Sequence, residues 1–262
     1  MTLRHGMILG VILLTLGGCA FGGDESPDPV VNQSTFLRLA EKSAAHQDYD
    51  MAAAMYQKAA AEDPKSLPAW LGLAKSLAAM GNSEDAMVAM KKAADLNPND
   101  LEAKRTLAGM LVSQMHLAEA EKTLIDALNI KPNGKMYNLL GVVYDLQNKP
   151  QLAVQSYYSG LVLAPDDLNL LTNLALSYGL GDKAADGIKL LQRVTSNPAS
   201  TARQRQNLAL LYVINNQPVL AEKILRMDGD DAVVEKNMQL FRKIAKMKPG
   251  AERIQSLVQV AQ

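Results

Sequence analysis

This 262-residue sequence is poor in the residues from which most active sites are built. It contains one cysteine, three histidines and one tryptophan, and aromatic residues make up 5% of it. A single cysteine cannot form an intramolecular disulfide, and no cysteine or histidine cluster has metal-ligand spacing. Lysine plus arginine (27) balances aspartate plus glutamate (27), so no excess of positive charge indicates nucleic acid as a partner. Scarce aromatic residues with abundant alanine and leucine favour helices over strands.

Catalytic motifs are lacking as well. The sequence has no His-Glu-x-x-His, no Cys-x-x-Cys and no serine nucleophile motif. The segment GLGDKA (179–184) has the loose form of a dinucleotide-binding loop, but such a loop follows a strand, whereas a helical pattern precedes Gly179. The acidic pairs within 165–167 and 229–231 are more typical of helix caps than of metal ligands. We therefore expect no enzymatic activity, no metal and no cofactor other than a covalent lipid, argued next.

The single cysteine, Cys19, follows an apolar stretch. Arg4 and His5 precede an apolar run over 7–16, and small residues come after it, which is typical of a secretory signal. The run falls short of the roughly twenty residues that span a bilayer. The block LGGC (16–19) resembles a bacterial lipobox, and this resemblance implies cleavage before Cys19 and a lipid on its thiol. The alternative is an ordinary signal peptide with an incidental cysteine.

The predicted signal peptide covers residues 1–18, and residues 19–32 are rich in Gly, Pro, Ser and Asp. Such a composition predicts a flexible tether between the lipid and the folded part. Residue 20 is alanine rather than the aspartate that often retains lipoproteins in the inner membrane. The resemblance to lipoproteins therefore implies an anchor at the periplasmic face of the outer membrane.

A proline recurs along the rest of the chain. Pro64, Pro98, Pro132, Pro165 and Pro198 follow one another at intervals of 34, 34, 33 and 33 residues. Repeats counted from residues 33, 67, 101, 134, 168 and 202 have alanine or glycine at both the eighth and the twentieth place. Their seventh place is leucine in every repeat. Small residues at fixed places predict two antiparallel helices that cross closely in each repeat.

This pattern resembles the tetratricopeptide repeat over residues 33–235. Trp70 lies at the fourth place, where the repeat favours tryptophan, and Gly81, Asn148 and Asn216 lie at the fifteenth place, which suits the left-handed residue that ends a helix. The resemblance implies an all-α fold, a right-handed superhelix of about six tetratricopeptide (TPR) helix pairs. Residues 236–262 are predicted to form a C-terminal capping helix and tail. The face with Val234, Met238, Phe241 and Ile244 indicates that the capping helix begins near 231.

In this repeat, the first helix of each pair lines a concave wall. The places that face it hold asparagines and apolar residues in the last three repeats, and we predict a peptide-binding site there formed by Asn138, Val142, Asn173, Leu176, Asn207 and Leu210. An asparagine amide can both donate to and accept from an extended peptide backbone, while apolar residues contact its side chains. The corresponding places of the first three repeats are more charged, with Arg38, Glu41, Lys75 and Arg105. The alternative is that the chain's own tail or neighbouring helices cover the apolar wall, so that it binds nothing.

The last repeat and the cap resemble a more specific family. The stretch RQNLAL (205–210), the pair Ala221-Glu222, and Val234, Asn237 and Phe241 are similar to the TPR lipoprotein of tight-adherence (Flp-type) pilus assembly systems. Asn216-Gln217 replaces that family's Gly-Asp turn, and only one aromatic residue, Phe241, stands in the final helix.

This resemblance implies an outer-membrane assembly factor that helps a secretin ring to form or to reach its place. It would hold a peptide or helix of a pilus component. Two alternatives remain: the pilotin of type IV pilus systems, and a periplasmic scaffold for cell-wall or outer-membrane biogenesis machinery.

Overall fold

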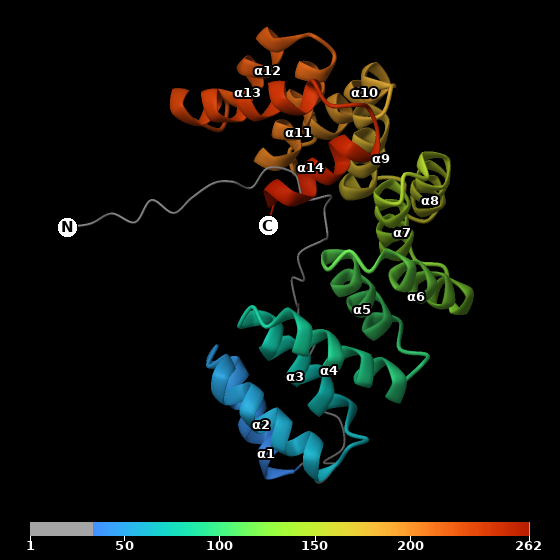
Figure 1. Ribbon diagram of the computed structural model, residues 1–262, viewed down its shortest axis with the longest axis vertical. Coiled ribbons are helices and arrows are strands. Elements are labelled where there is room, and N and C mark those ends of the chain that lie inside the picture. The colour runs from blue at the N-terminus through green and yellow to red at the C-terminus, as the bar shows by residue number, and fades with distance from the viewer. Residues whose placement is uncertain (1–33, 262) are drawn as a thin grey trace, which may run out of the picture. The chain divides into compact units, whose positions relative to one another are not determined.

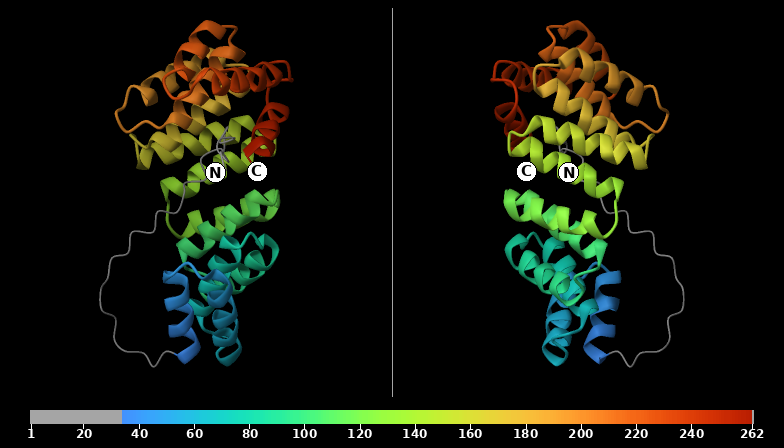
Figure 2. Two further views of the ribbon diagram at one scale, coloured as in Figure 1. Left: turned by 90° about the vertical axis from the view of Figure 1, so that its left-hand side faces the viewer. Right: turned by 90° about the vertical axis from the view of Figure 1, so that its right-hand side faces the viewer.

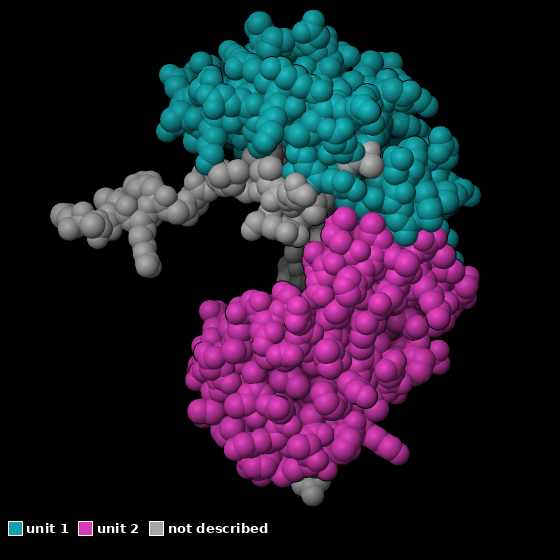
Figure 3. Space-filling view, in the orientation of Figure 1, with its two compact units in different colours: residues 1–18, 132–262 teal, residues 19–131 magenta. Residues whose placement is uncertain are grey.

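The computed structural model describes residues 34–261, and all of its regular structure in this range is helical (Figure 1). Its helices pair in sequence, as the repeat predicts, and fall into two compact units (Figure 3). Of the described residues, 34–131 form the N-terminal unit and 132–261 form the C-terminal unit. The all-α, TPR-like fold is therefore confirmed, and the division near residue 131 is a feature that the repeat pattern did not predict.

The N-terminal unit contains three helix pairs: α1 (Thr35–Ala45) with α2 (Tyr49–Glu62), α3 (Leu67–Ala79) with α4 (Ser83–Leu96), and α5 (Leu101–Ser113) with α6 (Leu117–Ile130). The C-terminal unit contains three more: α7 (Gly134–Leu146) with α8 (Pro150–Leu163), α9 (Leu168–Leu180) with α10 (Ala184–Thr195), and α11 (Ala202–Ile214) with α12 (Pro218–Leu225). Two helices follow in that unit, α13 (Asp231–Ala245) and α14 (Ala251–Ala261). The segment 179–184 spans the turn between α9 and α10, and Asp167 and Asp230 are N-caps, as expected.

Small residues at the eighth and twentieth places let the two helices of each pair touch. The alanines at these places are completely buried in every repeat, and Gly141 and Gly187 take the same places where alanine is absent. A Cβ built on Gly187 would lie 2.4 Å from the backbone oxygen of Ala175. At Gly187 the backbones are therefore too close even for alanine, whereas at the other places the complete burial of alanine leaves no room for a larger side chain.

The turn inside five of the six pairs passes through a left-handed residue at the fifteenth place. Gly81, Asn148 and Asn216 adopt positive φ as predicted, and so do Gln47 and Met115 (φ 61° and 60°). In each case the next N–H bonds back to the helix, as from Lys149 to the carbonyl of Tyr144 at 2.8 Å. This is the Schellman arrangement that satisfies the last carbonyls of a helix. Pro150 and Pro218 then open α8 and α12, where no N–H donor is needed.

The seventh-place leucines are buried in five repeats, but Leu39 in α1 is 46% exposed. Helix α1 is the first described helix, whereas each of the other five leucines lies on a helix that follows a complete pair. At the other end, α13 buries Val234, Met238, Phe241 and Ile244 and packs on α11 and α12. It therefore covers the last repeat as a capping helix, beginning at Asp231.

Candidate binding face of the C-terminal unit

The six predicted peptide-binding residues lie on α7, α9 and α11, the first helices of three consecutive pairs in the C-terminal unit. Each helix carries one asparagine and one apolar residue of the set. Helices α9 and α11 both begin with a side-chain cap, from Asp167 and Thr201 respectively. Because α9 contacts both α7 and α11, the three helices form one layer with the predicted residues in register.

The apolar residues of this set do not form an open wall. Val142, Leu176 and Leu210 are at most 1% exposed, and Leu146 and Leu180 further along the same helices are also buried. These apolar side chains are therefore buried within the C-terminal unit, as in the alternative in which the wall is covered. Helix α9 contacts both α7 and α11, and the C-terminal helix α14 contacts α7 as well; the red C-terminal segment lies beside the green helices of this unit (Figure 2).

Helix α14 folds back from α13 and lies against α7 (Figure 1). Three features fix its start: Pro249 follows α13, Gly250 has φ +95°, and the Gly250 N–H donates to the Leu180 carbonyl at 2.8 Å. Ile254 and Leu257 then bury their side chains. The sequence predicts a tail over this segment, whereas in the structure it is a packed helix of the C-terminal unit.

Arg253 joins α14 to α13. Its guanidinium donates to the carbonyls of Ala245 and Met247, both at 3.1 Å, and so satisfies the end of α13. Cations at a helix C-terminus interact favourably with the helix dipole. Arg253 is 8% exposed, and desolvation lowers the pKa of its guanidinium. Arg253 therefore fixes the connection between α13 and α14.

The three asparagines differ in their hydrogen bonding. The Asn173 amide donates to the Asn138 Oδ1 at 2.9 Å, which links α9 to α7. Asn173 is completely buried, so its amide is not open to a peptide in the way the repeat register predicts. Asn207 is also completely buried, yet neither its Nδ2 nor its Oδ1 has a hydrogen-bond partner in the described range. A buried amide without partners costs free energy, so Asn207 is the unsatisfied member of the set.

A buried hydrogen-bonded cluster around Asp145, at the junction of α7, α8 and α9, is not predicted by the sequence pattern. The Asp145 carboxylate accepts from the Tyr157 hydroxyl at 2.9 Å and from the Ser177 hydroxyl at 2.7 Å. Burial raises the pKa of Asp145 to about 7, although both hydrogen bonds act to lower it. Burial also raises the pKa of Tyr157. By register, Asp145 belongs to the concave wall, so only its place within an apolar run could have indicated that it is buried.

The charged places of the N-terminal unit were expected to be less coherent than those of the C-terminal unit. Glu41 and Lys75 are exposed, and Arg105 pairs with Glu102 on its own helix, with Nε donating to Oε2 at 2.9 Å. No described segment of this unit folds back over its first helices as α14 does.

Cys19 and the predicted signal lie outside the described residues. Among residues 34–261, no helix has the length and apolar character needed to cross a membrane, and no group of three or more potential ligands could hold a metal.

The family model for the tetratricopeptide repeat matches residues 43–90 and 77–142. Solved structures extend this likeness over most of the chain. The fold is a tetratricopeptide-repeat fold. PilW, described as a widely conserved type IV pilus biogenesis factor, is 18% identical with a TM-score of 0.65, covering 77% of this chain and 96% of its own. PilF from Pseudomonas aeruginosa is 16% identical with a TM-score of 0.59, covering 77% and 94%.

A third TPR structure, the Cut9–Hcn1 tetramer of the APC/C, is 20% identical with a TM-score of 0.61 over 79% of this chain. This chain spans 42% of that protein's length. No curated protein matches the sequence. Identities of this size establish the TPR fold and no finer relationship. TPR repeats generally serve as scaffolds for protein interactions.

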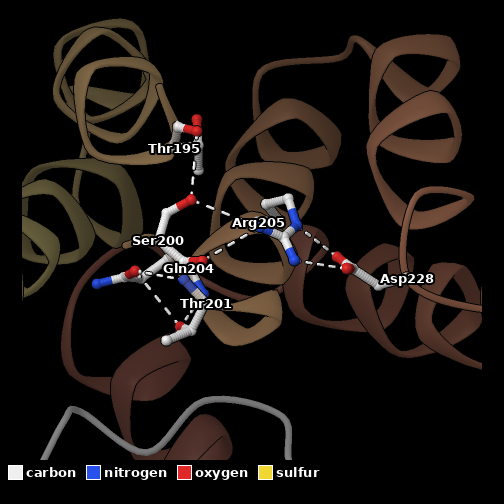
Figure 4. A network of polar contacts seen from close by, with 6 residues as sticks. All are labelled: Thr195, Ser200, Thr201, Gln204, Arg205 and Asp228. Atoms are coloured by element: carbon white, nitrogen blue, oxygen red, sulfur yellow. Dashed lines mark hydrogen bonds and ion pairs between the residues drawn. The ribbon is translucent and has the colours of Figure 1, made fainter. Parts of the chain in front are cut away.

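The residues that carry the resemblance to tight-adherence TPR lipoproteins lie at the end of this TPR array. Ala221, Val234, Asn237 and Phe241 are buried, so they help to specify the fold of the last repeat and its cap. Arg205 ties α11 to the segment that follows α12: its Nε and Nη2 each donate to the Asp228 carboxylate at 2.6 Å (Figure 4). The hydrogen bonds with Asp228 raise the pKa of Arg205.

The same network orders the start of α11. The Ser200 hydroxyl donates to the Thr195 carbonyl at 3.3 Å, and Thr201 and Gln204 form a capping box (Figure 4). The Gln204 amide also donates to the Thr172 hydroxyl of α9 at 3.3 Å. Gln204 and Arg205 thus tie α11 to α9 on one side and to Asp228 on the other, while the amide of Asn207 has no partner among residues 34–261.

Proposed function

We propose that this protein is an outer-membrane-anchored TPR lipoprotein that assists assembly of a tight-adherence (Flp-type) pilus. It would support assembly or localisation of the secretin ring in a pilotin-like way, by binding a secretin or another pilus component. The observation that carries the proposal is the TPR fold, which matches a type IV pilus biogenesis factor over nearly that protein's whole length. The lipobox-like block that ends at Cys19 and the resemblance of residues 205–210 to tight-adherence TPR lipoproteins support it.

The second candidate is a factor for a type IV pilus. It is favoured by the likeness to both PilW and PilF, each covered over more than nine-tenths of its length. Both candidates require a lipid on Cys19, a periplasmic position at the outer membrane and a protein partner. They differ only in which pilus system supplies that partner.

The first test is a gene deletion complemented with wild-type protein or with Cys19→Ser. We expect deletion to remove most of the secretin multimer from the outer-membrane fraction, wild type to restore it, and Cys19→Ser to restore little, because an unlipidated chain lacks its anchor. Immunoblotting of fractionated envelopes measures this. Normal multimers after deletion would contradict both pilus candidates.

Ala20→Asp is the matched control for the anchor. It leaves Cys19 in place, so the lipid should remain while the protein moves to the inner membrane. Crosslinking of wild-type protein in intact envelopes then identifies the partner. Recovery of a tight-adherence secretin favours the first candidate and recovery of a type IV secretin the second. Recovery of cell-wall synthases or outer-membrane insertion proteins would overturn both in favour of an envelope scaffold.

A further inference from the structure

We infer that α14 is an intramolecular ligand of the C-terminal unit, and that the place it occupies beside α7 is the docking site for an amphipathic helix of a partner. The partner helix would carry two apolar residues three positions apart, as α14 carries Ile254 and Leu257. This inference rests on the proposed function only in assuming that the partner is a protein.

The first observation is that α14 is an addition to a unit that is already complete. The last repeat has its own cap in α13, which buries four apolar side chains against α11 and α12. Helix α14 instead reaches back past that cap to α7, the first helix of the unit. A helix that served only to close the end of the array would have no reason to return to its beginning.

The second observation is the construction of the corner between α13 and α14. The five residues from Lys246 to Gly250 join the helices, and Gly250 has the φ of +95° that only glycine adopts without strain. The corner is fixed by the hydrogen bond from Gly250 to Leu180 and by the two from Arg253 to the end of α13. Rotation at Gly250 can move α14 away while the residues that α13 buries on the last repeat stay in place.

The third observation is the hydrogen-bonding state of the layer beside α14. Asn207 stands one repeat after Asn173, at the same place of the repeat, and its amide is fully buried without a partner in the described range. Asn173 at that place is paired with Asn138. Helix α11 of this layer therefore keeps one buried polar group that no described residue satisfies.

These observations predict competition. An intramolecular helix on a short connection has an effective concentration on the order of millimolar, so a free helix at micromolar concentration cannot displace it readily. Weakening α14 should therefore strengthen binding of a helix added in trans. Since α14 is the helix that occupies the site, the probe is a synthetic labelled peptide with the sequence of residues 251–262.

The experiment compares four full-length proteins by fluorescence anisotropy: wild type, Leu257→Asp, Arg253→Gln and Gln255→Asp. Leu257 is fully buried and Gln255 is exposed, so the two aspartate variants add the same charge on opposite sides of α14. We expect Leu257→Asp to bind the peptide at least tenfold more tightly than wild type, and Gln255→Asp to equal wild type. Arg253→Gln, which loses the corner hydrogen bonds but no buried leucine, should lie between them. A peptide that carries the Ile254→Asp change should not bind any of the four proteins.

Equal peptide affinity in all four proteins would overturn the inference. Circular dichroism checks that the variants fold. If Leu257→Asp does not fold, the comparison of Arg253→Gln with wild type still tests the inference. A second outcome against the inference would be a wild-type dimer that forms with rising concentration and that the peptide dissociates. It would mean that α14 of a second copy occupies this face, so the contact would not be intramolecular. The peptide is part of this chain, so its binding can succeed even if no secretin is captured. Failure of the proposed function is thus distinguishable from failure of this inference.

Discussion

Asn173 and Asn207 are chemically identical side chains, one repeat apart, in different hydrogen-bonding states. The Asn173→Ala variant leaves the Asn138 oxygen without its donor, and we expect it to lower the free energy of unfolding by about 1 kcal/mol. The Asn207→Ala variant removes two buried atoms that have no partner in the described part of the chain, and alanine is the better helix former. It should leave stability unchanged or raise it by up to about 1 kcal/mol.

Urea denaturation of the two variants, with equal m-values as the sign of an unchanged two-state transition, measures this difference. The outcome against our assignment would be equal losses in both variants. It would mean that Asn207 has a partner, such as ordered water, which compensates its burial.

Asp145 makes the stability of the C-terminal unit dependent on pH. Its pKa is raised from 3.8 to about 7 in the folded protein, mainly by burial. The proton is held more tightly in the folded state than in the unfolded state, so this contribution to stability is complete below about pH 4 and is lost as pH rises through 7. A shift of this size corresponds to at most about 4 kcal/mol.

The Asp145→Asn variant should therefore remove most of this dependence and be the more stable protein at pH 8. Its amide can still accept from one hydroxyl and donate to the other, because Tyr157 and Ser177 both carry hydroxyl groups. Thermal unfolding between pH 4 and 8 tests this, with the exposed Asp126→Asn as control for the loss of a carboxylate. Parallel curves for wild type and Asp145→Asn would show that Asp145 is ionised throughout.

At the scale of the helix pair, the left-handed turn at the fifteenth place recurs even where the residue there is neither glycine nor asparagine. Met115 adopts φ 60° without the freedom of glycine or the local hydrogen bonding of asparagine. It is 43% exposed, so little packing depends on its side chain. The Met115→Gly variant should therefore raise the free energy of unfolding by about 0.5–1 kcal/mol.

Met80→Gly is the matched control. Met80 is 44% exposed and immediately precedes the left-handed Gly81, but its own φ is −79°. Glycine there relieves no strain and adds freedom to the unfolded chain, so this variant should be destabilised. Differential scanning calorimetry of both variants decides the matter, and a loss of stability in both would show that position 115 is not strained.

The turns also show how far the sequence predicts structure at this scale. Helix pairing, the buried small residues, the caps at Asp167 and Asp230 and the turns at Gly81, Asn148 and Asn216 all follow from local patterns that recur with the repeat. The left-handed turn at Met115 does not, because the Schellman hydrogen bonds impose it against the preference of the side chain. The cluster around Asp145 was missed for a related reason: repeat register assigns a face to each residue but not the helices that cover it.

The binding face was predicted only in part. Register brought the six residues onto one layer of helices, and it also predicted three asparagines at comparable places. It could not show that Asn173 would bond to Asn138, since that contact joins residues 35 positions apart. Cover of the apolar wall by the chain's own tail is one alternative that the sequence leaves open, but a short amphipathic tail carries no signal for the helix on which it packs, so its contact with α7 is not predicted.

Across the whole chain, the two units differ in the side chains that fill their cores. The N-terminal unit buries mainly alanine, with fewer large residues such as Tyr56, Met90 and Leu124. The C-terminal unit buries leucines along α7, α9 and α11, together with Tyr157 and Phe241. A buried leucine removes much more apolar surface from water than a buried alanine, and stability in repeat arrays is approximately a sum over repeats and their interfaces.

We therefore expect the N-terminal unit to open at lower free energy than the C-terminal unit. Native-state hydrogen exchange with mass spectrometry should show faster exchange for amides of α1 to α6 than for those of α7 to α13, with α14 exchanging faster than α13. Low concentrations of urea should widen the difference between the units if they open separately. Uniform protection across both would show that the array unfolds as one cooperative body, so that the large side chains of the C-terminal unit also stabilise the alanine-rich repeats before it.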